Sequence, residues 1–155
     1  MAGVAPRLQA VDKYFVVYTP VLGPVIGEYT PRNSLEGEYV LRLIIDKTYM
    51  LDVLGIAHNE LARPEQHILL DSCSKDLPEP FIIDYESSTL SAKPRNVSQV
   101  IGGLHRVKAF TGCMVDSCLR NMLREYRSTL SPRLLAEIRE YIVMKCVRLS
   151  TSNVK

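Results

Sequence analysis

The sequence is poor in the aromatic residues that many binding proteins use as flat contact surfaces. It contains no tryptophan and only three phenylalanines among 155 residues. Proteins that hold single-stranded nucleic acid commonly stack bases on such side chains, so this scarcity argues against a stacking platform. Tyrosines in the first part of the chain could partly substitute for it. These are Tyr14, Tyr18, Tyr29 and Tyr39.

Long apolar runs and internal repeats are also missing. No stretch approaches the roughly 18 apolar residues of a membrane-spanning helix, and residues 1–12 lack the apolar core of an export signal. We therefore expect a soluble protein of the cytoplasm or nucleus with no membrane partner. The absence of repeats and heptads excludes solenoids and coiled coils. The length and the 46% hydrophobic content indicate one domain over residues 1–155, frayed at 1–10 and 150–155.

The motifs of several enzyme classes do not occur. The sequence has no P-loop, GxGxxG, GxSxG or HExxH pattern, so we predict no nucleotide cofactor. Four acids near the ends of expected strands or helices could supply paired catalytic carboxylates, but caps and turns often carry acids. These are Asp46, Asp52, Asp71 and Asp84.

The four cysteines, with no export signal, favour free thiols over disulfides. They are Cys73, Cys113, Cys118 and Cys146. Neither the Cys113-x4-Cys118 spacing nor the placement of His58, His67 and His105 matches a common metal site, and we predict no metal. One catalytic alternative remains open. Cys113 at a helix start could be a nucleophile with His105 as its base, as in a Cys–His hydrolase.

Charge is distributed unevenly along the chain. Residues 1–90 carry seven Lys or Arg and thirteen Asp or Glu, a net −6, whereas residues 91–155 carry twelve and four, a net +8. Such asymmetry is typical of a basic face for a polyanion or an acidic partner, although ordinary solvated surface produces it too.

The acidic part, residues 13–110, has the composition of short strands. Aromatic, β-branched or apolar runs predict strands at 13–19, 25–30, 38–45, 67–70 and 81–85, with a polar loop at 73–80. Residues 47–63 show helical periodicity that ends before Pro64, and the alternative is a strand at 48–54. Residues 87–96 are predicted to be a mobile loop. Gly102-Gly103 between two apolar runs predicts a β-hairpin over 97–110.

The basic part, residues 113–149, has the pattern of two helices. Apolar residues recur at helical spacing from 114 to 128, and Ser131-Pro132 is a typical start for a second helix. Because residues 141–147 are apolar on more than one side, we expect them to be buried or covered by a partner. The predicted fold is therefore α+β, a small, mostly antiparallel sheet of short strands packed against a C-terminal pair of helices. Its expected core comprises Val16, Leu41, Leu43, Ile45, Leu69, Ile82, Leu119, Met122, Ile138 and Ile142.

The leading hypothesis for function is a non-enzymatic interaction subunit or adaptor. Basic residues on the predicted loop, hairpin and helices follow one another in the chain and could form one cationic face. They are Lys93, Arg95, Arg106, Lys108, Arg120, Arg124, Arg127 and Arg133. The expected partner is another protein subunit with an acidic surface. RNA or DNA binding by the same face is the alternative, and a homo-oligomer is compatible with either.

A short segment resembles a known docking helix. Cys113-Met114-xxx-Cys118-xxx-Met122 is similar to the elongin-binding helix of von Hippel-Lindau and SOCS-box ubiquitin-ligase adaptors, in which a small or polar residue and Leu precede the Cys and an aliphatic residue follows it. Cys118 is the matching cysteine, and the resemblance spans about ten residues. It departs from the family pattern at Cys113 and Met114. The resemblance implies docking of the C-terminal helices to a protein.

Overall fold

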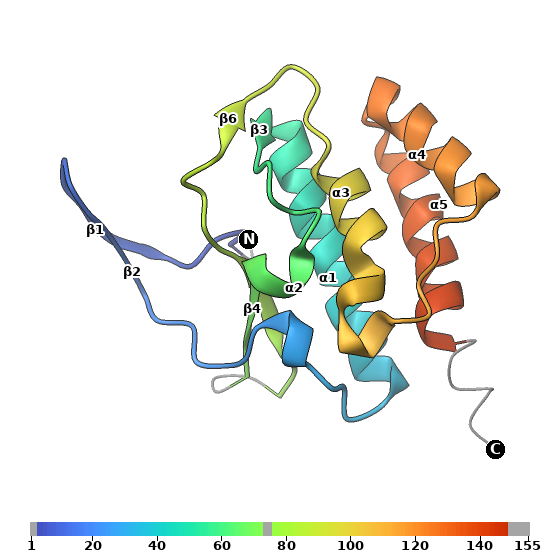
Figure 1. Ribbon diagram of the computed structural model, residues 1–155, viewed down its shortest axis with the longest axis horizontal. Coiled ribbons are helices and arrows are strands. Elements are labelled where there is room, and N and C mark those ends of the chain that lie inside the picture. Colours follow the sequence, from blue (N-terminus) through green and yellow to red (C-terminus); the bar gives the residue numbers. More distant parts are fainter. Residues whose placement is uncertain (1–2, 73–75, 149–155) are drawn as a thin grey trace.

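The computed structural model describes residues 3–72 and 76–148 and has an α+β fold (Figure 1). Its long helices are α1 (Ser34–Val53), α4 (Ser117–Thr129) and α5 (Pro132–Val143). Within the described residues, the strands pair as three separate two-stranded antiparallel sheets. The α+β class, the short antiparallel strands and the C-terminal helix pair are thus confirmed. Helix α1 lies between the helix pair and the strands and contacts both.

Helix α1 includes residues 38–45, so the strand predicted there is wrong. The Asn33 side chain caps the helix by accepting a hydrogen bond from the Glu36 N–H at 2.9 Å. Val40, Leu41 and the following isoleucines are buried because α1 is covered on several sides. A helix buried in this way has little polar alternation, and a short apolar run cannot then be distinguished from a buried strand.

Helix α1 ends just before Gly55, whose φ of 71° lies in the left-handed region that glycine tolerates. The helix predicted at 47–63 is therefore correct only as far as Val53, and the alternative strand at 48–54 is wrong. The chain continues as β3 (Ile56–Ala57), which pairs with β6 (Thr89–Leu90). Strand β6 lies inside the 87–96 segment that was predicted to be a loop.

The best-buried sheet consists of β4 (Ile68–Asp71) and β5 (Glu79–Ile82), with Ile68 opposite Ile82. These strands confirm the predictions at 67–70 and 81–85 in place but not in their bounds. Of the loop predicted at 73–80, residues 73–75 lie outside the described residues and 79–80 belong to β5. The strand predicted at 25–30 is wrong, because Ile26–Glu28 forms a 3-10 turn and only Val25 makes a β-bridge, to Leu69.

The first two strands form a hairpin that projects away from the rest of the molecule (Figure 1). Strand β1 (Leu8–Val11) pairs with β2 (Val16–Tyr18), which lies within the strand predicted at 13–19. Strand β1 also takes up part of the 1–10 segment that was predicted to be frayed, whereas residues 150–155 lie outside the described residues. Val16, expected in the core, is 49% exposed.

The β-hairpin predicted over 97–110 is wrong. The first part of this segment belongs to helix α3 (Asn96–Gly103), the next helix after the short α2 (Pro64–His67). Two 3-10 turns follow α3, at Leu104–Arg106 and Lys108–Phe110. A Cβ on Gly103 would clash with Ala62 and Pro64. Gly103 therefore packs closely against the segment 62–64, and the Gly102-Gly103 pair does not form a hairpin turn.

The two C-terminal helices agree with their local signals. Asp116 caps α4 by accepting from the Leu119 N–H at 2.9 Å, and Ser131 caps α5 by accepting from the Leu134 N–H at 3.3 Å. Leu130, with a φ of 49°, ends α4 in the left-handed conformation. Both helices predicted from the sequence are confirmed.

The core forms where α1, α3, α4, α5 and the β4–β5 sheet meet. Six of the ten predicted core residues are buried, namely Leu41, Ile45, Ile82, Leu119, Ile138 and Ile142. Leu43, Leu69 and Met122 are only partly buried. The apolar residues of segment 141–147 that are buried pack inside this chain, namely Ile142, Val143, Cys146 and Val147.

Cys113 and Cys146 form a disulfide, so the prediction of free thiols is wrong for this pair. The bond joins the segment before α4 to the π-helical turn Met144–Arg148 that follows α5. Cys118 is free and exposed, and Cys73 lies outside the described residues. None of the helices in the described ranges is long and apolar enough to span a bilayer.

Candidate functional site

The predicted basic residues are all exposed, but they occupy different parts of the fold. Lys93 and Arg95 precede α3, whereas Arg106 and Lys108 follow it. The eight residues of α3 span about 12 Å at 1.5 Å per residue, so the two pairs lie at opposite ends of the helix. Arg106 and Lys108 lie on 3-10 turns, so the hairpin expected to carry them does not exist.

The arginines of α4 do share one helix face. Arg120, Arg124 and Arg127 follow the i, i+4, i+7 spacing, and none of them makes an ion pair with a described residue. Arg133, on α5, is paired with Glu137 at 3.3 Å. The structure thus brings three of the eight predicted residues together with their charges unneutralised.

The Cys–His nucleophile is contradicted by the structure. Cys113 is 5% exposed and bonded to Cys146, and His105 is exposed on a 3-10 turn. A disulfide sulfur cannot act as the thiolate that this chemistry requires. The adaptor-like spacing also loses its basis, because Met114 precedes the first residue of α4 and does not share a helix with Cys118 and Met122.

A cluster that the sequence did not predict lies at the end of the β4–β5 sheet. Glu60, His67 and Asp84 each offer a ligand atom, and these atoms lie within 4.8 Å of one another. Glu60 comes from the turn between β3 and α2, His67 ends α2, and Asp84 follows β5. The Ile68–Ile82 register and the bond from the Ile83 N–H to the His67 carbonyl at 3.0 Å bring His67 and Asp84 together.

His67 lies between the two carboxylates. Its Nε2 is 3.2 Å from Glu60 Oε2, and its Nδ1 is 3.7 Å from Asp84 Oδ2. The residue is 5% exposed, yet neither ring nitrogen has a partner with hydrogen-bond geometry among the described residues. A buried polar atom without a hydrogen bond is costly, so this imidazole needs an explanation beyond packing.

A second buried histidine stands beside the cluster. His58 is fully buried, and its Nε2 donates to the Ile83 carbonyl at 2.8 Å. Its other ring nitrogen has no hydrogen-bond partner in the described chain. The His58 and His67 ring centroids are 5.6 Å apart. Burial lowers the pKa of His58, so its imidazole favours the neutral form.

The backbone is strained at two points of this cluster. Asn59, between His58 and Glu60, has a φ of 70°, and Asp84 has a φ of 66°. The Asn59 side chain donates to the Ser87 carbonyl at 2.7 Å and to Thr89 Oγ1 at 3.2 Å, which fixes the loop. Non-glycine residues in this conformation are uncommon, and they concentrate at functional sites.

Buried polar groups behind the cluster hold its loop in place. The Asn96 side-chain oxygen accepts from the His58 N–H at 3.0 Å, and its amide donates to Asp52 at 2.8 Å. Asp52 also accepts from the Val97 N–H and from the Tyr126 hydroxyl. These donors lower the pKa of Asp52, but burial has the larger effect and raises it above its usual value. The loop is thereby tied to α1, α3 and α4.

The sequence analysis names three of the residues in and beside this cluster but does not bring them together. Asp84 was recognised as an acid at a strand end, and His58 and His67 were considered and set aside because they form no close pair in the sequence. Glu60 carried no signal, since an acid in a turn is ordinary. The stronger clue is the combination of a His-x-Glu-Leu segment before one strand and an Asp two residues after the next strand.

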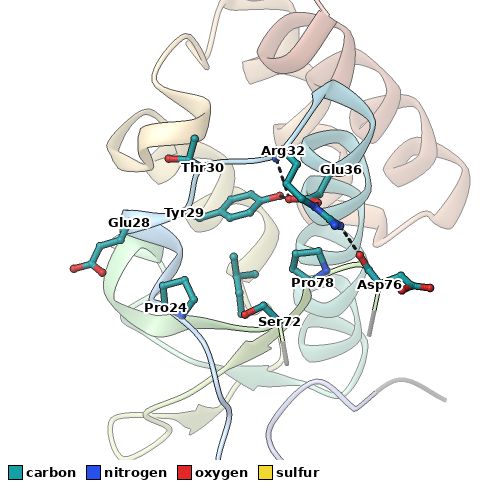
Figure 2. A pocket seen from close by; sticks show the side chains of 10 residues that line it. Pro24, Glu28, Tyr29, Thr30, Arg32, Glu36, Ser72, Asp76 and Pro78 are labelled. Atoms are coloured by element: carbon teal, nitrogen blue, oxygen red, sulfur yellow. Dashed lines mark hydrogen bonds and ion pairs between the residues drawn. The ribbon is translucent and has the colours of Figure 1, made fainter. Parts of the chain in front are cut away.

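A polar hollow lies at the other end of the sheet, with a volume of about 320 Å³ (Figure 2). Tyr29 and Arg32 both donate to Glu36, which is 3% exposed, and Arg32 also donates to the Asp76 carbonyl. Burial disfavours the charged carboxylate, but these donors outweigh it and hold the Glu36 pKa below its usual value. The polar groups here satisfy one another, so the hollow has the character of a structural contact.

Comparison with known proteins does not assign a function. No protein-family model matches the chain, and no curated protein is significantly similar to it in sequence. The candidate sites therefore rest on the geometry and chemistry of this chain.

Proposed function

We propose that the Glu60–His67–Asp84 cluster binds a divalent metal ion and that metal binding is the primary function of the chain. The observation that carries this proposal is the His67 imidazole, buried between two carboxylates and without a hydrogen bond to either. Metal ligation would give the imidazole the partner that the protein does not supply. The two carboxylates would neutralise a double positive charge.

The donor set favours a borderline metal. One imidazole nitrogen and two carboxylate oxygens suit Mn²⁺, Fe²⁺ or Zn²⁺ better than Ca²⁺, which prefers oxygen ligands alone. The side chains of Glu60 and Asp84 are 31% and 44% exposed, so the site is open on one side. A site with protein ligands on one side only leaves room for water or substrate.

We further propose metal-assisted phosphoryl transfer as the chemistry of this site. In protein kinases, an H-R-D-L loop provides the acid near the reacting hydroxyl, and a following Asn and the Asp of D-F-G hold magnesium. Here residues 58–61 read H-N-E-L, His67 follows, and residues 84–86 read D-Y-E. The chain departs from that pattern at most positions. Asn59 replaces the Arg, Glu60 replaces the Asp, His67 replaces the Asn at a wider spacing, and Tyr-Glu replaces the Phe-Gly pair. The chain has no Gly-rich nucleotide loop.

These residues have separate roles in the proposal. A divalent ion would polarise a phosphoryl oxygen as a Lewis acid. Glu60, His67 and Asp84 would hold it, and the open side of the site would admit an attacking hydroxyl or water. His58 would support the loop from behind through its bond to the Ile83 carbonyl. Asn96 would keep Glu60 in register by holding the His58 N–H.

Titration with Mn²⁺ tests the proposal. Chelator-treated protein is titrated by calorimetry, and we expect saturable binding that weakens at least tenfold in His67→Ala and in Asp84→Asn. His105→Ala is the matched control, since His105 is exposed and is not one of the candidate ligands. Asp84→Asn replaces a partly exposed side chain and should leave the circular dichroism melt near that of wild type. Wild-type protein that takes up no Mn²⁺, or two variants that bind it like wild type, would overturn the proposal.

A second experiment addresses the chemistry. ATP should bind the Mn²⁺-loaded protein more tightly than the metal-free protein, and Asp84→Asn should abolish the difference. If ATP affinity is independent of Mn²⁺, the metal site stands but phosphoryl transfer does not.

The arginine face of α4 supports a second candidate function. We propose that Arg120, Arg124 and Arg127 dock this chain on an acidic protein surface, as an interaction subunit or adaptor would. The three charges lie on one helix face and lack ion-pair partners among the described residues. Capture of nucleic acid by the same face is the competing outcome.

A cytoplasmic or nuclear location remains part of this proposal. The Cys113–Cys146 disulfide is the point against it, because those compartments keep most thiols reduced. Trapping of thiols in intact cells would show which state the pair has there.

A further inference from the structure

Exposed apolar side chains gather where α1 ends and β6 passes it. Leu90, on β6, is 88% exposed, more than any other large hydrophobic residue in the described ranges. Val53 and Leu54, at the end of α1, are 53% and 59% exposed. Leu90 pairs with Ile56 of β3, and Figure 1 shows β3 and β6 together at the upper end of α1. Neighbouring exposed apolar side chains of this kind are typical of an interaction site.

The segment that carries Lys93 and Arg95 is anchored to the same end of α1. Two hydrogen bonds, from the Ser91 N–H at 2.8 Å and from the Asn96 N–H at 2.9 Å, join this segment to residues 52–55. Both basic residues lie between these two anchors. The hydrogen bonds therefore place two cations beside the exposed apolar side chains.

Both cations point outward and are not neutralised. Lys93 and Arg95 are exposed, whereas Pro94 between them is buried. Neither cation makes an ion pair with a described residue. The segments that form this part of the surface, 53–57 and 87–95, contain no Asp or Glu. The surface thus combines apolar side chains with positive charge alone.

We propose that this surface, formed by Val53, Leu54, Leu90, Lys93 and Arg95, binds a segment of another protein that carries acidic and apolar side chains. Charge complementarity selects this occupant, because carboxylates neutralise the two cations while apolar side chains cover the leucines. A nucleic acid fits this surface less well. Two cations neutralise few phosphates, and neither segment contains an aromatic residue on which a base could stack.

The surface adjoins the candidate metal site without using its ligands. Leu90 follows Thr89, whose Oγ1 accepts a hydrogen bond from the Asn59 side chain at 3.2 Å. Asn59 lies between His58 and Glu60 in the loop of that site. A bound peptide therefore lies close to the metal loop, but its docking does not depend on the metal.

Fluorescence anisotropy on the full chain without added metal tests the proposal. The probe is a labelled synthetic peptide of alternating Glu and Leu residues, and we expect saturable binding. The double variant Lys93→Glu/Arg95→Glu should raise the Kd about tenfold or more, because like charges then face the peptide. Leu90→Ser should raise it about tenfold, because an apolar contact is lost. A second peptide, with Gln in place of each Glu, should bind wild type more weakly.

Three exposed positions provide matched controls. Arg106→Glu reverses a charge at the opposite end of α3, and Arg120→Glu reverses one on the arginine face of α4. Leu35→Ser removes a side chain that is 76% exposed at the opposite end of α1, about 27 Å away at 1.5 Å per residue. All three variants should bind the Glu–Leu peptide like wild type.

Each alternative outcome overturns the proposal. Wild type that fails to bind the Glu–Leu peptide, or that binds the Gln–Leu peptide equally well, has no acidic-peptide site. Surface variants that bind like wild type, or controls that weaken binding as much, would place the contact elsewhere. Oligouridylate that binds more tightly than the peptide would make nucleic acid the occupant. The substituted residues are exposed, so their circular dichroism melts should match that of wild type. Mn²⁺ binding is measured separately, and its failure would leave this proposal standing.

Discussion

Asn96 and His58 are 38 positions apart in the chain, and the side-chain oxygen of Asn96 accepts a hydrogen bond from the backbone N–H of His58 at 3.0 Å. The amide of Asn96 donates to Asp52 at 2.8 Å and to the Ile56 carbonyl at 2.6 Å. One fully buried side chain thus connects the end of α1, the loop of the candidate metal site and the start of α3.

Replacement of Asn96 should affect both stability and metal affinity. Asn96→Ala leaves the buried His58 N–H without its acceptor and removes one of the donors to Asp52, and we expect the free energy of unfolding to fall by about 2–3 kcal/mol. The loop that carries Glu60 would also lose its anchor, so Mn²⁺ should bind more weakly. Urea unfolding and Mn²⁺ titration measure the two effects. Gln99→Ala, three residues further along α3, is the control and should change neither.

Glu36 should make stability depend on acid pH. Burial opposes its charge, but the donors Arg32 and Tyr29 outweigh burial and hold its folded pKa below 4.5. A lowered folded pKa means a stabilising contribution that is complete above about pH 4.5 and lost as the pH falls through the folded value. Glu36→Gln should therefore be less stable than wild type at pH 7, with a difference that shrinks in acid. A difference that stays constant between about pH 7 and pH 3 would contradict this assignment.

The Cys113–Cys146 disulfide should contribute substantially to stability. It closes a loop with a sequence separation of 33, for which loop-closure entropy predicts about 3–4 kcal/mol. Cys146→Ser should lower the melting temperature of oxidised protein, and a reducing agent should lower that of wild type equally. Cys118→Ser removes the exposed free thiol and serves as the control, since it should melt like wild type.

The arginine face of α4 predicts salt-sensitive binding. Charge reversal of Arg120, Arg124 and Arg127 to Glu should abolish binding to an acidic partner without unfolding the protein, because all three side chains are exposed. Heparin retention at low and high salt provides a first readout. An A260 signal that co-purifies with wild type and is released by salt would favour nucleic acid over a protein partner. A triple variant that elutes like wild type would exclude this face.

The C-terminal helices could be predicted because their signals are local. Asp116 and Ser131-Pro132 mark the helix starts, and the apolar spacing of α4 and α5 identifies the faces that pack. Each signal lies within one or two helical turns, so neither helix needs the rest of the fold to be specified. The exposure of the α4 arginines follows from the same periodicity.

The sequence by itself therefore determined the α+β class, the helix pair and the approximate place of β4 and β5. Tertiary structure decided that residues 38–45 are helical, because an apolar run carries no period once several sides are covered. It also decided that Gly103 packs against Pro64 and does not form a turn. The candidate metal site depends entirely on the tertiary structure. His67 and Asp84 meet because β4 pairs with β5 in one register, and Glu60 joins them because the turn before α2 packs beside that pair. The packing of the whole fold selects this register, so no single segment of the sequence marks it.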